Sequence, residues 1–147
     1  MNVTLKISLI AIVIAVAPAG IAAAAGPSKP AVEVIDGNTL IVGASRHTLY
    51  GIKAPSLGET CMVRGAMRDC GLIARSSMLD LTAGATVVCD RAPGAAASRS
   101  RCRANGYDLS EGMVHTGWAR ALADGPRRFK RIMAEAKDRK RGMWRRQ

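Results

Sequence analysis

Aromatic side chains are scarce in this 147-residue sequence, which has two Trp, two Tyr and one Phe. Proteins that bind single-stranded nucleic acid usually stack successive bases on aromatic side chains. A binding mode based on stacking is therefore disfavoured. We expect Trp118 and Trp144 to anchor the core and the end of the chain rather than to hold bases.

Acidic residues are also few: 11 Asp and Glu stand against 22 Lys and Arg, giving a formal net charge of +11. An excess of positive charge favours anionic partners such as nucleic acid, phospholipid surfaces or acidic polymers, and it says nothing about the fold. Solubility alone is the competing explanation.

The first residues carry an apolar run from Ile7 to Ala17 and a stretch of small residues from Ala22 to Ala25. This pattern is typical of a secretory signal peptide with an A-x-A cleavage site. An uncleaved membrane anchor is the alternative, but it needs about 20 predominantly apolar residues. We expect a signal peptide at 1–25, a lead-in at 26–31 and one domain at 32–147, with no transmembrane segment after cleavage and a periplasmic or secreted product.

No C-x-x-C pair accompanies the two histidines, so a structural zinc site is disfavoured. An even number of cysteines in a small exported chain indicates a disulfide framework instead. Three pairings are possible among the four cysteines, which are Cys61, Cys70, Cys89 and Cys102.

Strand-like runs separated by turn residues predict a mainly β protein. The expected strands cover residues 32–35, 39–42, 47–52, 86–89 and the surroundings of 101–103. The connections between the first three are too short for a parallel crossover.

Three helices are expected as well. One lies between Cys70 and Leu81, a short one opens with a capping box at 108–111 and is closed by Gly117, and the last begins near Pro126. Five short strands with a helix after the third and helices after the fifth predict an α+β fold, a five-stranded OB-type barrel with three helices.

The last helix has an apolar stripe, interrupted at Lys140, made by Phe129, Ile132, Met133, Ala136 and Met143. If the stripe turns inward, most cations of this segment face outward, where they bind phosphates by releasing counterions. The candidate nucleic-acid-binding residues are Arg127, Arg128, Lys130, Arg131, Lys137, Arg139, Lys140 and Arg141. A solvated helix face with no partner is the alternative.

Two stretches, Val34 to Val42 and Leu49 to Ser56, resemble the V-I-D-G-D-T and R-L-Y-G-I-D-A-P-E blocks of the thermonuclease family, the staphylococcal-nuclease-like domains. Asp108-Leu109, Gly117-Trp118-Ala119 and Arg141 to Trp144 resemble later blocks of that family, in the same order. The resemblance implies an SNase-like OB-fold, calcium-dependent endonuclease activity and disulfides joining Cys61 to Cys70 and Cys89 to Cys102.

The same comparison implies that the side chains used by the family to bind calcium and cleave nucleic acid are replaced in this chain. The family's two calcium-binding aspartates fall on Asn38 and Lys53, the glutamate that activates water falls on Ser56, and its two arginines fall on Thr48 and approximately on Ala97. Calcium needs carboxylate charge to offset its dehydration, and a lysine about 4 Å from a divalent ion is unfavourable by several kcal/mol. A serine hydroxyl does not act as a base at neutral pH without help. We expect no calcium cofactor and no catalytic residue at these positions.

Nearby residues have structural explanations too. Asp36 precedes a glycine and is interpreted as turn-forming. Arg99, Arg101 and Arg103, around the fifth strand, are interpreted as solvated.

Three hypotheses for the function remain open. The first is an exported, catalytically degenerate thermonuclease homologue that binds nucleic acid or another anionic polymer. The second is an active calcium-dependent nuclease with a relocated site of any design, one version of which uses Glu59 and Arg46. The third is an envelope protein-interaction module whose charge is incidental. The sequence indicates neither a particular partner nor an oligomeric state.

Overall fold

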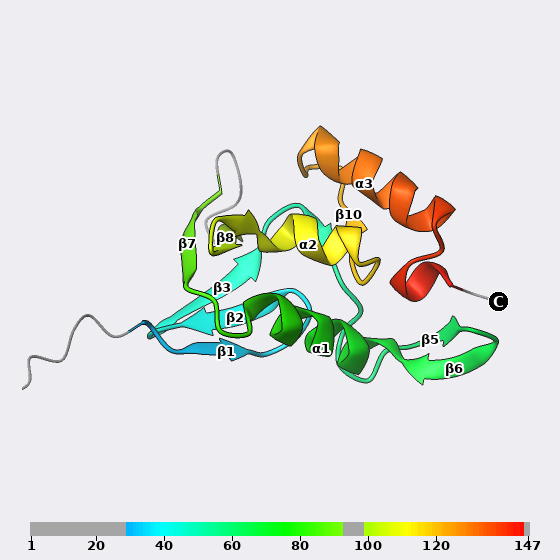
Figure 1. Ribbon diagram of the computed structural model, residues 1–147, viewed down its shortest axis with the longest axis horizontal. Coiled ribbons are helices and arrows are strands. Elements are labelled where there is room, and N and C mark those ends of the chain that lie inside the picture. Colours follow the sequence, from blue (N-terminus) through cyan, green and yellow to red (C-terminus); the bar gives the residue numbers. More distant parts are fainter. Residues whose placement is uncertain (1–28, 93–98, 146–147) are drawn as a thin grey trace, which may run out of the picture.

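A computed structural model describes residues 29–92 and 99–145 of the chain (Figure 1). The expected signal peptide at 1–25 and the candidate Ala97 lie outside the described residues. No helix among the described residues is long and apolar enough to cross a membrane.

The main sheet follows the order β1-β2-β3-β8-β7, and β9 pairs with β8 beside this path. Its strands are β1 (Val32–Val34), β2 (Thr39–Val42), β3 (Ser45–Leu49), β7 (Val87–Arg91), β8 (Arg99–Ala104) and β9 (Tyr107–Asp108). All neighbours are antiparallel except β3 and β8, which pair in parallel. The sheet curls into a half-barrel (Figure 1). The α+β class is therefore confirmed, whereas closure into a five-stranded OB-type barrel stays a prediction.

The third expected strand, 47–52, is interrupted. β3 ends at Leu49, Gly51 adopts a φ of 75°, and the chain resumes as β4 (Ile52–Lys53), which pairs with β10 (Arg120–Ala121). A positive φ suits glycine because it has no Cβ. The interruption separates Lys53 from the main sheet and places it opposite Arg120.

A hairpin that the sequence analysis did not anticipate precedes the first helix. It consists of β5 (Thr60–Val63) and β6 (Ala66–Asp69), joined by Arg64 and Gly65, which both have positive φ, 52° and 72°. Two such residues make a type I′ turn. The hairpin projects at the same end of the molecule as the C-terminal turn (Figure 1).

Both disulfides predicted from the resemblance are present. Cys61–Cys70 ties the hairpin to the first residue of helix α1, and Cys89–Cys102 joins directly opposed residues of β7 and β8. The four cysteines are all used. Bridges closing loops of this length each stabilise the fold by about 3 kcal/mol.

Helices α1 and α2 each begin directly after a capping aspartate. In α1 (Cys70–Thr82) the first turn is capped by Asp69, and in α2 (Leu109–His115) the Asp108 carboxylate accepts from the Glu111 backbone N–H at 3.2 Å. The Asp108 half of the predicted capping box therefore starts α2, whereas the Glu111 carboxylate accepts from Arg128 Nε.

The last helix is shorter than predicted. α3 (Arg127–Asp138) ends before Lys140, which has a φ of 49°, and Met143 belongs to a separate 3₁₀ turn, η1 (Gly142–Trp144). Met143 was wrongly placed on the helix, and the polar Lys140 marks the chain reversal. Phe129 and Ala136 of α3 are buried as predicted, and Met143 is buried too, although it lies in η1.

The core lies between the curled sheet and the helices. Its largest fully buried side chains come from every layer: Leu40, Leu49 and Ile52 from the strands, Met78 from α1, Leu109 and Met113 from α2, and Phe129 from α3. Packing of α2 and α3 into this common core fixes the helices relative to the strands that carry the candidate site.

Gly117, which follows α2, provides a test of how the C-terminal turn is held. It has a φ of 80°, and a Cβ there would lie 2.4 Å from the Arg141 carbonyl oxygen. We predict that Gly117→Ala lowers the free energy of unfolding by more than about 2 kcal/mol, because strain and backbone overlap combine. Gly43→Ala is the matched control, since Gly43 has a φ of 62° and open space around it. Urea unfolding of both variants measures the difference, and equal losses would contradict the close packing.

Candidate nucleic-acid interface

The structure brings together most of the positions that correspond to the family's catalytic residues. The Leu49 backbone N–H donates to the Asn38 carbonyl at 2.8 Å, so the start of β2 lies against the end of β3, next to Thr48. The Ala54 N–H donates to Asn38 Oδ1 at 2.7 Å, which brings in the segment with Lys53. Ser56 follows two residues after Ala54, so four of the five positions come from adjoining segments, as the resemblance implied.

Asn38 bonds to the backbone around it through both ends of its amide. Its Oδ1 accepts from Ala54 N–H, and its Nδ2 donates to the Ala54 carbonyl at 3.4 Å. Its own N–H donates to Asp36 Oδ1 at 2.7 Å, as expected of a turn-forming aspartate. The Asn38 side chain therefore joins two segments of backbone.

Lys53 and Arg120 face each other across the β4–β10 pair, and both are exposed. Like charges directly opposite on neighbouring strands repel. A cleft of about 110 Å³ beside them is lined by a single carboxylate, that of Glu59. A cation is disfavoured here, and an anion is favoured.

Glu59 and Arg46, the residues of the relocated-site hypothesis, have separate roles. Glu59 Oε2 accepts from Ser56 N–H at 3.0 Å, while Glu59 N–H donates to the Ser56 carbonyl at 2.9 Å. Arg46 is paired with Ile41 near the turn of the β2–β3 hairpin. No hydrogen bond or ion pair joins Arg46 to Glu59 in the described part of the chain.

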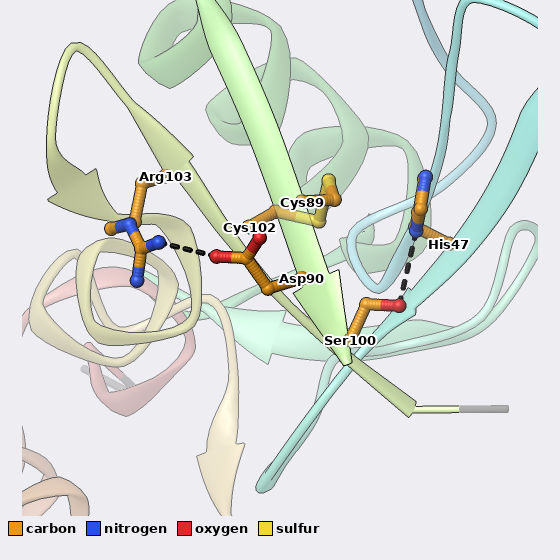
Figure 2. Close-up of a disulfide and its surroundings, with 6 residues drawn as sticks. All are labelled: His47, Cys89, Asp90, Ser100, Cys102 and Arg103. Carbon is orange, nitrogen blue, oxygen red and sulfur yellow. Dashed lines mark hydrogen bonds and ion pairs between the residues drawn. A yellow bond between two sulfur atoms is a disulfide. The ribbon is translucent and has the colours of Figure 1, made fainter. Parts of the chain in front are cut away.

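One group of potential metal ligands occurs within residues 29–92 and 99–145, namely His47, Cys89 and Cys102. Figure 2 shows that the two sulfur atoms are bonded to each other and that His47 Nδ1 is directed to Ser100 Oγ, 3.0 Å away. Disulfide sulfurs are not thiolates, so this group does not hold a metal while the bridge is intact.

The arginines of β8 are not simply solvated, and that interpretation was wrong. Arg99 Nη1 donates to the Leu49 carbonyl at 3.1 Å, Arg101 lies 3.9 Å from Asp108, and Arg103 forms an ion pair with Asp90 (Figure 2). The parallel pairing of β3 with β8 aligns Arg99 with Thr48. A guanidinium therefore lies next to a position where the family has an arginine, although it comes from another strand.

The candidate cations of the C-terminal segment are divided by the structure. The exposed ones are Arg127, Lys130, Arg131, Lys137, Arg139 and Lys140, whereas Arg128 and Arg141 are partly buried. Arg128 donates from Nε to Glu111 and from Nη2 to Asp108, both at 2.8 Å. Two carboxylates neutralise it, so its predicted place in the outer patch was wrong: Arg128 ties α3 to α2.

The same two carboxylates act on Tyr107. Burial of part of its ring, together with the charges of Glu111 and Asp108, raises the pKa of the Tyr107 hydroxyl above its usual value. The phenol is therefore neutral at physiological pH and does not serve as a base.

Trp144 connects the exposed cations of α3 with β10. Lys137 Nζ lies 4.7 Å and Arg120 Cζ 5.8 Å from its ring centroid, which are cation–π distances. We call the exposed set formed by Lys53, Arg120 and Lys137 the basic strip. It runs from the position of a family calcium ligand to the surface of α3.

Neither the known family models nor the curated proteins contain a match to this chain.

The Asn38 bridge yields a stability prediction. Asn38→Ala leaves the N–H and carbonyl of the buried Ala54 without their side-chain partner, so the free energy of unfolding should fall by about 2 kcal/mol. Asn38→Asp keeps one acceptor for Ala54 N–H and should lose less, about 1 kcal/mol. Denaturant unfolding of the two variants checks the order. No loss in Asn38→Ala would show that the bridge does not hold the loop.

Proposed function

We propose that this chain is an exported thermonuclease-like protein, built on an OB-type barrel, that binds nucleic acid or another anionic polymer without cleaving it. The observation that carries the proposal is the pairing of Lys53 with Arg120 where the family has a calcium-binding carboxylate. Two disulfides are compatible with export.

The electrostatics at this position favour a phosphate over a metal. Two unit charges 4 Å apart interact by about 4 kcal/mol at an effective dielectric near 20, so two adjacent cations oppose a divalent ion strongly. The same pair attracts a phosphodiester oxygen. Lys53 thus carries a positive charge at a position where the family has a negatively charged aspartate.

Cleavage would need a base that takes a proton from water. Ser56 offers only a hydroxyl, and Oε2 of the neighbouring Glu59 carboxylate accepts from the Ser56 backbone. This arrangement supports binding without turnover.

The exposed cations of α3 extend the interface beyond the strip. Arg127, Lys130 and Arg131 lie on its first turns, and Arg139 and Lys140 lie at its end. Exposed Lys and Arg neutralise phosphates and release counterions without reading the base sequence. The expected ligand is therefore any polyanion with closely spaced phosphates.

The position of Arg99 beside Thr48 favours the alternative, a nuclease with a relocated site. An arginine in such a place stabilises charge on a phosphoryl group. It supplies neither the metal nor the base, so we rank this alternative second.

The salt dependence of binding to random-sequence duplex DNA tests the proposal. If about four phosphates are engaged, log K should fall against log salt concentration with a slope of roughly −3.6. The double variant Lys53→Gln, Arg120→Gln should flatten the slope by about 1 to 2 units. Fluorescence anisotropy across a salt series provides the measurement.

The matched control is Arg46→Gln, Arg91→Gln, which removes two exposed cations outside the strip and should leave the slope unchanged. Equal flattening by both double variants would contradict the location of the interface. Undetectable binding at low salt would put the envelope-interaction hypothesis first.

A further inference from the structure

A second basic site lies outside the basic strip. A cleft of about 750 Å³ opens between the β5–β6 hairpin, the start of α1, the end of α2 and the C-terminal turn. Its wall contains Arg64 and Arg68 of the hairpin and Arg141 and Arg145 near η1. We call it the arginine cleft. Figure 1 shows the hairpin and the C-terminal turn at the same end of the molecule.

No carboxylate of the described residues compensates the charge of the arginine cleft. None of them lines it, and the ion pairs within 29–92 and 99–145 use only Asp90, Asp108 and Glu111. Arginine side chains stay charged at all physiological pH values. Positive charges of four arginines that line one cleft repel one another, and an anion in the cleft would offset that repulsion.

Backbone contacts hold the side chains of Arg141 and Arg145 and the main chain of Arg64. Arg64 N–H donates to the Arg145 carbonyl at 2.6 Å, which anchors the hairpin tip to the C-terminal turn. Arg141 Nη1 donates to the His115 carbonyl and Arg145 Nε donates to the Lys140 carbonyl, each at 3.3 Å. The Cys61–Cys70 bridge fixes the base of the hairpin. A site prepared in this way loses little freedom when it binds its ligand.

Arg64 also occupies an unfavourable backbone conformation. It has a φ of 52° at a type I′ turn position, where Asn or Gly is the usual residue. Strained residues of this kind cluster at ligand sites. The turn itself does not require an arginine, so the presence of Arg64 there calls for another explanation.

Most of the rest of the wall is apolar. Ile73 and Trp118 lie on it together with Val63, Thr116, Gly142 and His115. The volume is that of a small-molecule pocket, and such pockets combine apolar walls with a few fixed polar groups. Guanidinium groups bind phosphate oxygens through paired hydrogen bonds.

We propose that the arginine cleft binds a phosphate ester with at least two negative charges, with its organic part against Trp118 and Ile73. Either a free nucleotide or the phosphorylated end of a nucleic acid offers this chemistry. The site uses none of the basic strip, so it stands or fails independently of the function proposed above.

Calorimetric titration of the oxidised protein with inorganic pyrophosphate at low salt tests the charged part of the site. We expect saturable binding at one site, weakened tenfold or more by Arg64→Asn. Asparagine suits the positive φ of this turn position, so Arg64→Asn should keep or raise the melting temperature. Arg46→Asn, at an exposed position on β3, should not alter the affinity. Absence of saturable binding, or equal affinity in Arg64→Asn, would overturn the proposal.

Adenosine diphosphate then tests the apolar wall and the source of the ligand. It should bind more tightly than pyrophosphate and shift the indole N–H resonance of Trp118 more than that of Trp144. A 5′-phosphorylated oligonucleotide should compete with it if the ligand is a polymer end, and an unphosphorylated one should not. Equal affinities for pyrophosphate and adenosine diphosphate would overturn the role of Trp118 and Ile73. The variant Lys53→Gln, Arg120→Gln should retain pyrophosphate binding even if it loses DNA binding.

Discussion

The two hydrogen bonds between the Asn38 side chain and the backbone of Ala54 hold together the segments that carry the candidate site. A carboxylate only accepts hydrogen bonds, whereas an amide also donates, so Asn38 satisfies both the N–H and the carbonyl of Ala54. The side chain of Asn38 thereby ties the loop at Ala54 to the start of β2. The next residue back, Lys53, is held at the surface opposite Arg120, and the basic strip follows from that pairing.

The excess of positive charge is divided into a structural part and a free part. Arg101, Arg103 and Arg128 lie close to carboxylates and tie strands and helices together. Many of the cations without such partners among the described residues lie on two surfaces, the basic strip with α3 and the arginine cleft, whereas others, such as Arg46 and Arg91, lie outside both. The net charge of the sequence predicted an anionic partner. Which cations are available for such a partner depends on where the carboxylates lie, and only the structure shows this.

Local signals predicted local structure well. The capping aspartate of α2 and the turn at Asp36 each depend on residues three or fewer positions apart, and the strands and helices of the predicted core were found. The hairpin at 60–69 was missed because it is largely exposed and lacks a buried alternating face. The position of Arg99 depends on the parallel pairing of β3 with β8, and that pairing joins segments about fifty residues apart. Such contacts leave no periodic signal in the sequence.

The central claim is that the site of the family's metal chemistry now attracts phosphate and repels calcium. Calorimetric titration of the oxidised protein with calcium, on a preparation that gives saturable heat with duplex DNA at low salt, tests it most directly. The account predicts no saturable heat with calcium, since Asn38 is bound to backbone and Lys53 faces Arg120. Saturable binding of one calcium ion, weakened by Glu59→Ala, would contradict it.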